Sequence, residues 1–248
     1  MDESELQAML AADEGHWWYR GRRRVIRAVL DGMPLPAGAR ILDAGCGSGR
    51  MLDELADYGS VSGIDVSEMA AEAARARGHG EVRVGPLEAL PWEDDTFDVV
   101  TAFDVIEHTP DDRATLRELR RVTRPGGRAL ITVPAYQRLF SAHDVVNHHY
   151  RRYERPSLLA AAEETGWEAG RTSYFNSVLL PPAAAVRLVQ RRSRNEPKGS
   201  SDLALTPPRL NAVLELPMRA EAAWLRRGRR LPAGLSLLAV LTNPGPPP

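Results

Sequence analysis

The sequence is short of several residue types, and each shortage excludes a class of protein. Its 248 residues include a single cysteine, Cys46, which excludes an internal disulfide framework and a cysteine-clustered zinc site. A reducing cytoplasm is therefore the expected setting. Lys198 is the single lysine, and the formal net charge is -1. A near-neutral chain has no bulk field that would draw it onto nucleic acid, so we expect no nucleic-acid partner.

Long apolar runs are also lacking. The longest candidate, residues 177–188, contains two prolines and falls short of the roughly 18 apolar residues that span a bilayer. The first ten residues are acidic and include no basic leader before an apolar run. We therefore expect neither a signal peptide nor a transmembrane segment, while peripheral contact with a membrane stays open.

From about residue 40 the chain alternates apolar strand-like runs, glycine turns and helical segments. Strands are predicted at residues 39–43, 61–65, 81–84, 97–103, 128–133, 167–174 and 235–241. This alternation predicts a doubly wound, Rossmann-like α/β fold with a seven-stranded, mostly parallel sheet, and it places a ligand at the carboxyl ends of the strands. A helical insertion is expected before the last strand.

The predicted elements divide the chain into three parts. Residues 1–37 form a helical leader, and residues 38–176 with 233–248 form the ligand-binding domain. Residues 177–232 form the insertion, which we expect to serve as a lid or as a dimer surface. A monomer and a homodimer both stay open.

A glycine loop at residues 43–49 follows the first predicted strand and precedes a helix. Its glycines permit a tight turn with backbone N–H groups aimed at a ligand, although a glycine-rich turn alone is common in α/β folds. Arg50 replaces the third glycine of the dinucleotide fingerprint. The carboxylate of Asp43 would repel a pyrophosphate, but it suits a ligand that carries an ammonium and a sulfonium group. Asp65, at the end of the next strand, can bind the hydroxyls of a ribose. Together these features favour a cationic nucleoside over NAD.

These residues resemble the class I S-adenosylmethionine-dependent methyltransferases. The matching segments are Leu42-Asp43-Ala44-Gly45-Cys46-Gly47-Ser48-Gly49, Gly63-Ile64-Asp65, residues 90–100, residues 103–108 and Arg124-Pro125-Gly126-Gly127. The resemblance implies S-adenosylmethionine as cofactor. It implies that the glycine loop binds the methionine part of the cofactor and that Asp65 binds the ribose. Val66 and the Leu87 backbone would contact the adenine, and Asp104 would line the bottom of the site near the transferred methyl group. The implied cofactor-binding set in the sheet domain is Asp43, Gly45, Cys46, Gly47, Gly49, Asp65, Val66, Leu87 and Asp104. Where many relatives have an acid after strand three, this chain has Gly85-Pro86-Leu87, so Glu88 is an alternative partner for the adenine amino group.

Residues 16–23 are similar to the leader of a bacterial subgroup of the same family, in which it packs over the cofactor. The resemblance implies that Tyr19 or Arg20 holds the cofactor carboxylate, because arginine grips carboxylates bidentately. The alternative is that Trp17 and Trp18 only pack a helix onto the sheet.

The loop after strand five, residues 141–153, contains three of the six histidines. The subgroup shows a similar His-Asp pair, a second His and an Arg-Arg-Tyr run. His143 or His149 could take a proton from the acceptor, and Asp144 could orient the imidazole. The expected substrate-binding residues are Tyr136, His148, Arg151, Arg152 and Tyr153. The alternative is a polar loop with structural histidines.

The run Asp104-Val105-Ile106-Glu107-His108 resembles a metal-binding stretch of the ubiquinone-pathway O-methyltransferases. It is common in the superfamily without a metal, so the favoured interpretation is that Glu107 and His108 shape the loop, and no metal is expected.

The sequence thus predicts methyl transfer to a hydroxyl or carboxyl oxygen of a small, acidic metabolite or natural product. Alternatives are N- or C-methylation of a lipid-linked or peptide acceptor, and a non-catalytic S-adenosylmethionine-binding scaffold.

Overall fold

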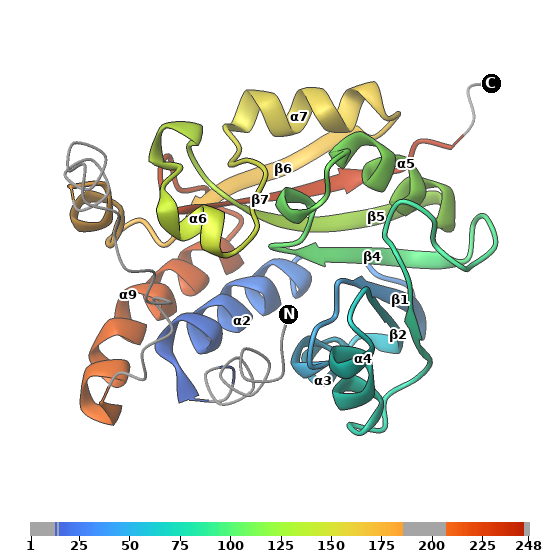
Figure 1. Ribbon diagram of the computed structural model, residues 1–248, viewed down its shortest axis with the longest axis horizontal. Helices are drawn as coiled ribbons and strands as arrows, with labels where there is room; N and C mark the ends of the chain where they lie inside the picture. The colour runs from blue at the N-terminus through green and yellow to red at the C-terminus, as the bar shows by residue number, and fades with distance from the viewer. Residues whose placement is uncertain (1–12, 14, 186–206, 246–248) are drawn as a thin grey trace.

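The structure, a computed structural model, describes residues 13, 15–185 and 207–245 (Figure 1). The helices are α2 (Trp17–Leu30), α3 (Arg50–Leu55), α4 (Glu68–Arg75), α5 (Asp112–Val122), α6 (Ala142–Val146), α7 (Arg155–Glu164) and α9 (Pro208–Arg226), with 3-10 turns η1 (Ile106–His108) and η2 (Gln137–Leu139). The strands are β1 (Ala39–Ala44), β2 (Gly59–Asp65), β3 (Val82–Val84), β4 (Phe97–Phe103), β5 (Thr123–Pro134), β6 (Glu168–Phe175) and β7 (Ser236–Thr242).

The seven strands form one sheet in the order β3-β2-β1-β4-β5-β7-β6. The pairs from β3 through β5 are parallel, and β7 runs antiparallel to both of its neighbours. The predicted mostly parallel, doubly wound sheet is confirmed. Strand order reverses between β1 and β4, so the crevice at their carboxyl ends is the place where such sheets bind ligands.

β5 begins earlier than the sequence predicts. The sequence predicts this strand at residues 128–133, yet α5 stops at Val122 and β5 already includes Thr123. Thr123 is extended, with φ -90° and ψ 125°, and pairs with Phe97 of β4. Gly126 supplies a left-handed φ of 78° within the strand.

Helices cover both faces of the sheet (Figure 1). On one face α5 and α7 close a core that includes Leu116, Leu158 and Ile131. On the other face α2 buries Val25, Ile26 and Leu30 against β1, β4 and β7. Helix α2 is therefore a structural part of the sheet domain.

Helix α9 of the predicted insertion lies beside α2 rather than over the sheet. The two helices approach closely at Gly21, where an added Cβ would come within 2.4 Å of Met218 Sδ. Trp18 of α2 also stacks on Phe175 of β6, with ring centroids 6.0 Å apart and planes 5° apart. The start of α2 is thus held from two sides, by α9 and by the end of β6.

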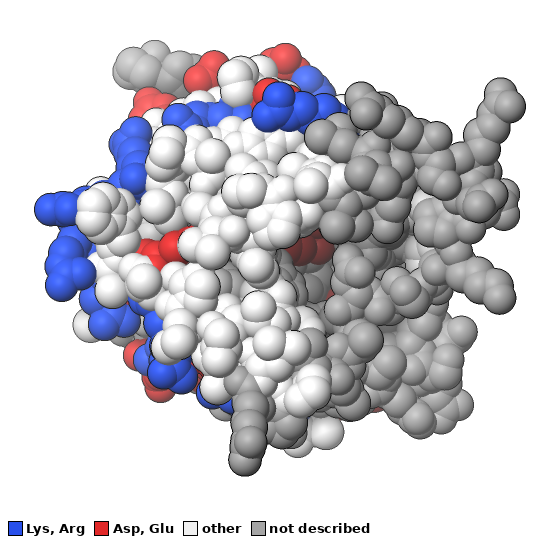
Figure 2. All heavy atoms as spheres, turned by 90° about the vertical axis from the view of Figure 1, so that its left-hand side faces the viewer, with Lys and Arg blue, Asp and Glu red and all other residues white. Residues whose placement is uncertain are grey.

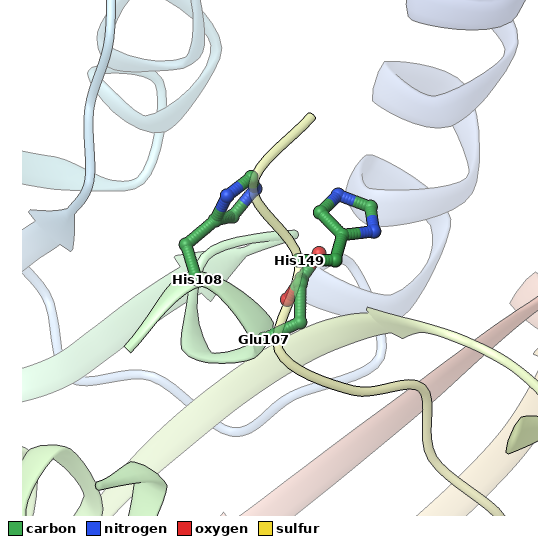
Figure 3. Close-up of side chains that lie close together, drawn as sticks. All are labelled: Glu107, His108 and His149. Carbon is green, nitrogen blue, oxygen red and sulfur yellow. The ribbon is translucent and has the colours of Figure 1, made fainter. Parts of the chain in front are cut away.

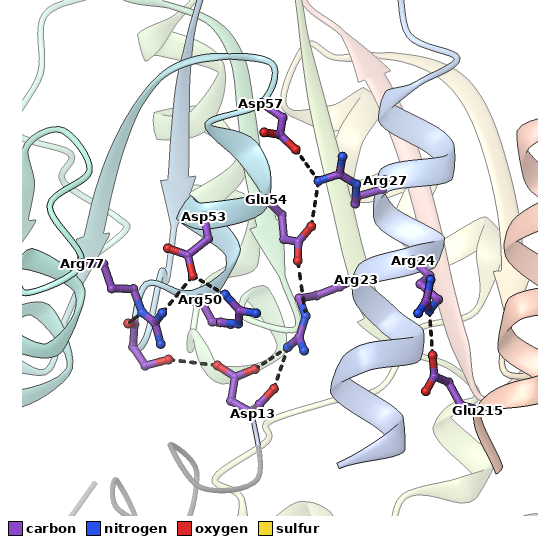
Figure 4. Close-up of polar contacts among 11 residues, drawn as sticks. Asp13, Arg23, Arg24, Arg27, Arg50, Asp53, Glu54, Asp57, Arg77 and Glu215 are labelled. Atoms are coloured by element: carbon purple, nitrogen blue, oxygen red, sulfur yellow. Dashed lines mark hydrogen bonds and ion pairs between the residues drawn. The ribbon is translucent and has the colours of Figure 1, made fainter. Parts of the chain in front are cut away.

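Ion pairs connect α2 to α3 and to Asp13, which is hydrogen-bonded to the glycine loop (Figure 4). Arg23 donates to Asp13 at 3.0 Å, and the other Asp13 oxygen accepts a hydrogen bond from Ser48 Oγ at 2.9 Å. Arg27 donates to Glu54 at 2.8 Å. Ser48 belongs to the glycine loop, so the leader is tied directly to that loop.

Within the described residues, no helix has the length and apolar character that crossing a bilayer requires.

Candidate functional site

The glycine loop joins β1 to α3 through three residues with left-handed backbone. Gly45, Gly47 and Gly49 have φ values of 75°, 53° and 76°. The N–H groups of Gly45 and Cys46 both donate to the Ile64 carbonyl at the end of β2, at 2.8 and 3.0 Å. A Cβ on Gly45 would lie 2.4 Å from Val105 Cγ2. Backbone angle and space both require glycine there, and the loop is held close to the end of β4.

Asp43 lies beneath this loop at the end of β1. It is 2% exposed, and its Oδ1 accepts a hydrogen bond from Thr101 Oγ1 of β4 at 2.7 Å. Burial raises the pKa of Asp43 to about 7, against the opposing effects of the Thr101 hydrogen bond and of the Arg22 charge. A cationic ligand group beside Asp43 would favour the ionised form.

Asp65 ends β2 at the same edge of the sheet. Its Oδ2 accepts from the Gly47 N–H and its Oδ1 from the Ser67 N–H, both at 2.9 Å. These bonds fix the carboxylate while each oxygen keeps a further lone pair for a ligand. The neighbouring Val66 is 77% exposed, and such exposure suits a side chain that packs against a planar ring.

Leu87 and Glu88 lie in the segment after β3. Leu87 is buried, at 7% exposure, and the Gly85 N–H donates to the Asp65 carbonyl at 3.0 Å. The backbone of this segment is therefore bonded directly to the end of β2, next to Asp65 and Val66.

Asp104 follows β4 with a φ of 56°, and its N–H donates to the Thr132 carbonyl of β5 at 2.8 Å. Its carboxylate accepts a hydrogen bond from Arg22 at 2.7 Å. An aspartate whose backbone is in the left-handed region is strained, so the surrounding structure must stabilise it. Residues with such backbone strain cluster at functional sites.

The leader reaches the site through Arg22 and Tyr19. The guanidinium of Arg22 lies 5.5 Å from the Tyr19 ring centroid, and burial raises the pKa of the Tyr19 phenol. Arg20, the arginine singled out from the sequence, points to α9 instead and pairs with Glu215 at 3.1 Å. Sequence reasoning missed Arg22, although Tyr19 and Arg22 are three residues apart and so share one helix face.

Asp144 is the centre of the loop after β5. It is fully buried, and its Oδ1 contacts His149 Nδ1 at 3.0 Å and accepts from Arg152 Nε at 2.6 Å. Its Oδ2 accepts the Ser141 N–H at 2.9 Å. Burial alone would raise the pKa of Asp144, but hydrogen bonds from His149 and Arg152 lower it below its usual range. Because Nδ1 of His149 is bound to Asp144, Nε2 is the free ring nitrogen.

The remaining acceptor-side residues are spread around this centre. Arg151 and Tyr153 both contact Asp112 at the start of α5, at 3.2 and 2.8 Å. Tyr136 stacks on Tyr174 with ring centroids 5.3 Å apart. His148 is exposed and has a φ of 56°. His143 belongs to α6, and its side chain lies outside what the structure describes, so its assignment stays a prediction.

Glu107 and His108 of η1 meet His149 in this region (Figure 3), and one ligand atom from each lies within 4.8 Å of the others. Glu107 is completely buried, and neither carboxylate oxygen has a hydrogen-bond partner. Burial raises its pKa well above the usual range, helped by the charge of Asp104. Burial, together with the charge of His149, lowers the pKa of His108 to about 4. This group thus places His108, with its lowered pKa, and the ring of His149 beside an unsatisfied buried carboxyl.

On the face that carries α6 and α9, the described surface combines apolar and charged side chains. In Figure 2 uncharged side chains predominate in the middle of the described part of this face, with a few acidic ones among them, and arginine side chains gather along its edge. The large exposed apolar residues of α6, α9 and their flanking segments are Val145, Val146, Tyr150, Val178, Leu210, Val213, Leu216 and Trp224. The described apolar surface thus adjoins the acceptor loop.

Comparison with known proteins places this geometry in a family. Residues 42–131 match the Methyltransferase domain family. A curated relative, the ubiquinone biosynthesis O-methyltransferase of Xanthomonas oryzae pv. oryzae, is 33% identical over 185 residues, which cover 64% of this chain and 77% of the relative.

Solved structures share the fold. A chain of the Haloferax volcanii complex between the Trm112 methyltransferase activator and a methyltransferase is 22% identical, with a TM-score of 0.65, covering 100% of this chain and 98% of that one. The phosphoethanolamine N-methyltransferase 2 of Haemonchus contortus, solved with S-adenosyl-L-methionine, is 19% identical with a TM-score of 0.65, covering 98% of this chain and 58% of that one. With the glycine loop, Asp43 and Asp65 gathered at the carboxyl edge of a seven-stranded sheet, the chain belongs to the class I methyltransferases that use S-adenosylmethionine.

Proposed function

We propose that the protein transfers the methyl group of S-adenosylmethionine to an oxygen atom of a small, acidic metabolite or natural product. One observation carries the proposal: the Asp144–His149 pair stands next to the residues that follow β4, at the cofactor edge of the sheet. The 33% identity to an O-methyltransferase supports oxygen as the acceptor atom.

In this proposal the leader and the strand ends hold the cofactor. Asp43 attracts its ammonium, Asp65 binds the ribose hydroxyls, and Val66 with the Leu87 backbone packs against the adenine. Asp104, fixed by Arg22, lies near the sulfonium. Methyl transfer needs the acceptor oxygen, the methyl carbon and the sulfur in line, so the site contributes mainly by positioning.

On the acceptor side, His149 can take the hydroxyl proton through Nε2, since Asp144 holds Nδ1. Arg152 is committed to Asp144, and it fixes that carboxylate rather than the acceptor. Arg151 is paired with Asp112 at 3.2 Å but keeps a quarter of its side chain exposed, and it lies 5.9 Å from the Tyr150 ring. This cation beside an exposed aromatic ring supports an acidic acceptor.

A second candidate is N- or C-methylation of a lipid-linked or peptide acceptor. It is favoured by the exposed apolar side chains of Val145, Val146 and Tyr150 in the acceptor loop itself. A purely small and polar acceptor would not require them.

A two-stage assay tests the proposal. Calorimetric titration with S-adenosylhomocysteine, with NAD as control, is expected to show binding of the former only. Formation of S-adenosylhomocysteine is then measured with hydroxylated aromatic acids, with amines and with lipid-linked phenols. Turnover confined to the acids supports the first candidate, and turnover confined to amines or lipid-linked acceptors supports the second. Cofactor binding without turnover on any of these classes would favour a non-catalytic scaffold.

A further inference from the structure

A hollow beside α2 is lined almost entirely by arginine. Its volume is about 280 Å³, and its lining residues are Arg20, Arg23, Arg24, Arg27, Arg50 and Glu54. The four arginines of α2 follow the spacing i, i+3, i+4 and i+7, which places side chains along one face of a helix. The other two residues are four positions apart on α3. A volume just below the roughly 300 Å³ at which small-molecule pockets begin suits a compact ligand.

The carboxylates around this hollow are each shared between arginines or bound to an arginine that has a second partner. The shared pairs are Glu215 with Arg20, Arg24 and Arg219, Glu54 with Arg23 and Arg27, and Asp53 with Arg50 and Arg77 (Figure 4). Asp13 and Asp57 pair with Arg23 and Arg27 in addition. In the part of the chain that the structure describes, seven arginines thus meet five carboxylates here, which leaves an excess of two positive charges.

The guanidinium groups keep hydrogen-bond donors for a ligand. The side chains of Arg20, Arg24, Arg27 and Arg50 are between 32% and 48% exposed. The Nε of Arg50 is buried and has no hydrogen-bond partner. A guanidinium presents five N–H donors in a planar fork that matches two oxygens of a phosphate. An anion with several oxygens can therefore bind more than one of these arginines at the same time.

Arg23 is the most buried arginine of the group, with 8% of its side chain exposed. Burial lowers the pKa of its guanidinium, and the charges of Arg50 and Arg22 lower it further, against the opposing charges of Asp13 and Glu54. Its cationic form would be stabilised by further negative charge nearby. A bound anion would supply that charge.

We propose that the hollow between α2 and α3 binds a soluble anion that carries a phosphate or diphosphate group, at a site separate from that of the cofactor. Arginine binds phosphate bidentately, and the excess of two positive charges complements such an anion. Arg22, on another side of α2, is the arginine that reaches Asp104 at the cofactor edge. The proposal goes beyond methyl transfer and does not depend on which acceptor the protein uses.

The test is calorimetric titration of the full-length protein with inorganic diphosphate, in a buffer free of phosphate and sulfate. We expect one diphosphate per chain, bound with an affinity that falls as the NaCl concentration rises. Saturation with S-adenosylhomocysteine is expected to leave this affinity unchanged. Arg27→Gln and Arg50→Gln are each expected to weaken diphosphate binding at least 10-fold, because each removes charge-assisted hydrogen bonds.

Arg117→Gln is the matched control, since Arg117 is an exposed arginine of α5 that lies 3.7 Å from Asp111, outside the hollow. It is expected to keep wild-type diphosphate affinity. Circular dichroism verifies that each variant is folded without requiring any ligand. Wild-type protein that binds no diphosphate would overturn the proposal. So would unchanged affinity in a folded protein that carries both Arg27→Gln and Arg50→Gln.

Two further measurements separate the proposed anion from other sources of negative charge. Competition between diphosphate and S-adenosylhomocysteine would overturn the proposal, because the anion would then occupy the cofactor site. Vesicles of phosphatidylglycerol, with phosphatidylcholine as the comparison, present phosphate as a lipid headgroup. Binding to the anionic vesicles by protein that binds no diphosphate would assign the arginines to a lipid headgroup and overturn the soluble anion.

Discussion

At the scale of single residues, the two carboxylates proposed to bind the cofactor lie in different environments. Asp43 is buried with Thr101 as its hydrogen-bond donor, and Asp65 is held by two backbone N–H groups. The first is expected to respond to pH and the second to act as a fixed acceptor.

Replacing Asp65 with alanine removes the acceptor proposed for the ribose and frees the Gly47 and Ser67 N–H groups. We expect Asp65→Ala to weaken S-adenosylhomocysteine binding about 100-fold or more, because each charged hydrogen bond contributes about 1.5–3 kcal/mol. Calorimetric titration measures this. Asp57→Ala, at a carboxylate bound to Arg27, is the control, and wild-type affinity in Asp65→Ala would remove the ribose assignment.

The pKa of Asp43, raised to about 7 by burial, predicts a pH dependence of cofactor binding. Below pH 7 the carboxyl is protonated and attracts a cationic ligand weakly, so affinity is expected to rise from pH 6 to pH 8 and then level off. The free energy of unfolding of the unliganded protein depends on pH in the opposite direction. Because the raised pKa favours the neutral carboxyl in the folded state, the contribution of Asp43 to stability is lost as pH rises from about 4 through 7.

Titrations at several pH values, with Asp43→Asn as the comparison, check this dependence. The asparagine variant keeps the size of the side chain and cannot ionise, so its affinity should be flat over the same range. A wild-type profile as flat as that of the variant would contradict the role of Asp43.

At the scale of elements, α2 connects the site to the rest of the fold. Arg22 reaches Asp104, whereas Arg20 and Arg24 pair with Glu215 of α9. Arg22 therefore lies on the side of α2 that faces the site, and Arg20 and Arg24 lie on the side that faces α9.

Arg22→Ala is expected to weaken S-adenosylhomocysteine binding about 10-fold, because Asp104 loses a hydrogen-bonded cation in a half-buried setting. Arg24→Ala, on the α9 side of the same helix, should change affinity less than about twofold. Calorimetric titration of both variants with S-adenosylhomocysteine measures the two affinities. If Arg20→Ala lost affinity and Arg22→Ala did not, the sequence-based assignment of Arg20 would be restored.

The contact between α2 and α9 at Gly21 has almost no free space, since an added Cβ meets Met218. Gly21→Val is expected to destabilise the protein by about 1–3 kcal/mol, as overpacking in cores does. Urea denaturation measures the change. Combining it with Met218→Ala should recover part of the loss, and additive losses in the double variant would show that the clash lies elsewhere.

At the scale of the whole molecule, the sequence predicts the fold well and the site in part. Glycines 45, 47 and 49 and the strand-ending acids are local signals, so the cofactor edge could be placed from them. The pairing of Arg22 with Asp104 and the closeness of Glu107 to His149 could not be predicted, because both contacts depend on packing between segments distant in sequence. His149 was found from its residue type, but its closeness to His108, 4.6 Å between rings, is a tertiary fact.

Ligand binding should stabilise the whole chain by mass action. At about 100 times its Kd, S-adenosylhomocysteine is expected to add about 2.7 kcal/mol to the free energy of unfolding, while NAD adds nothing measurable. Denaturant titration with and without each compound tests this. Equal stabilisation by NAD would contradict the cofactor assignment.

The stacking of Trp18 on Phe175 has a practical consequence. Two of the five tryptophans, Trp17 and Trp18, belong to the turn of α2 that also presents Tyr19 and Arg22 to the site. A ligand that binds beside Tyr19 and Arg22 is expected to alter the surroundings of both indoles. Intrinsic tryptophan fluorescence should therefore report the arrival of the cofactor, and its rate can be followed by stopped flow without any label.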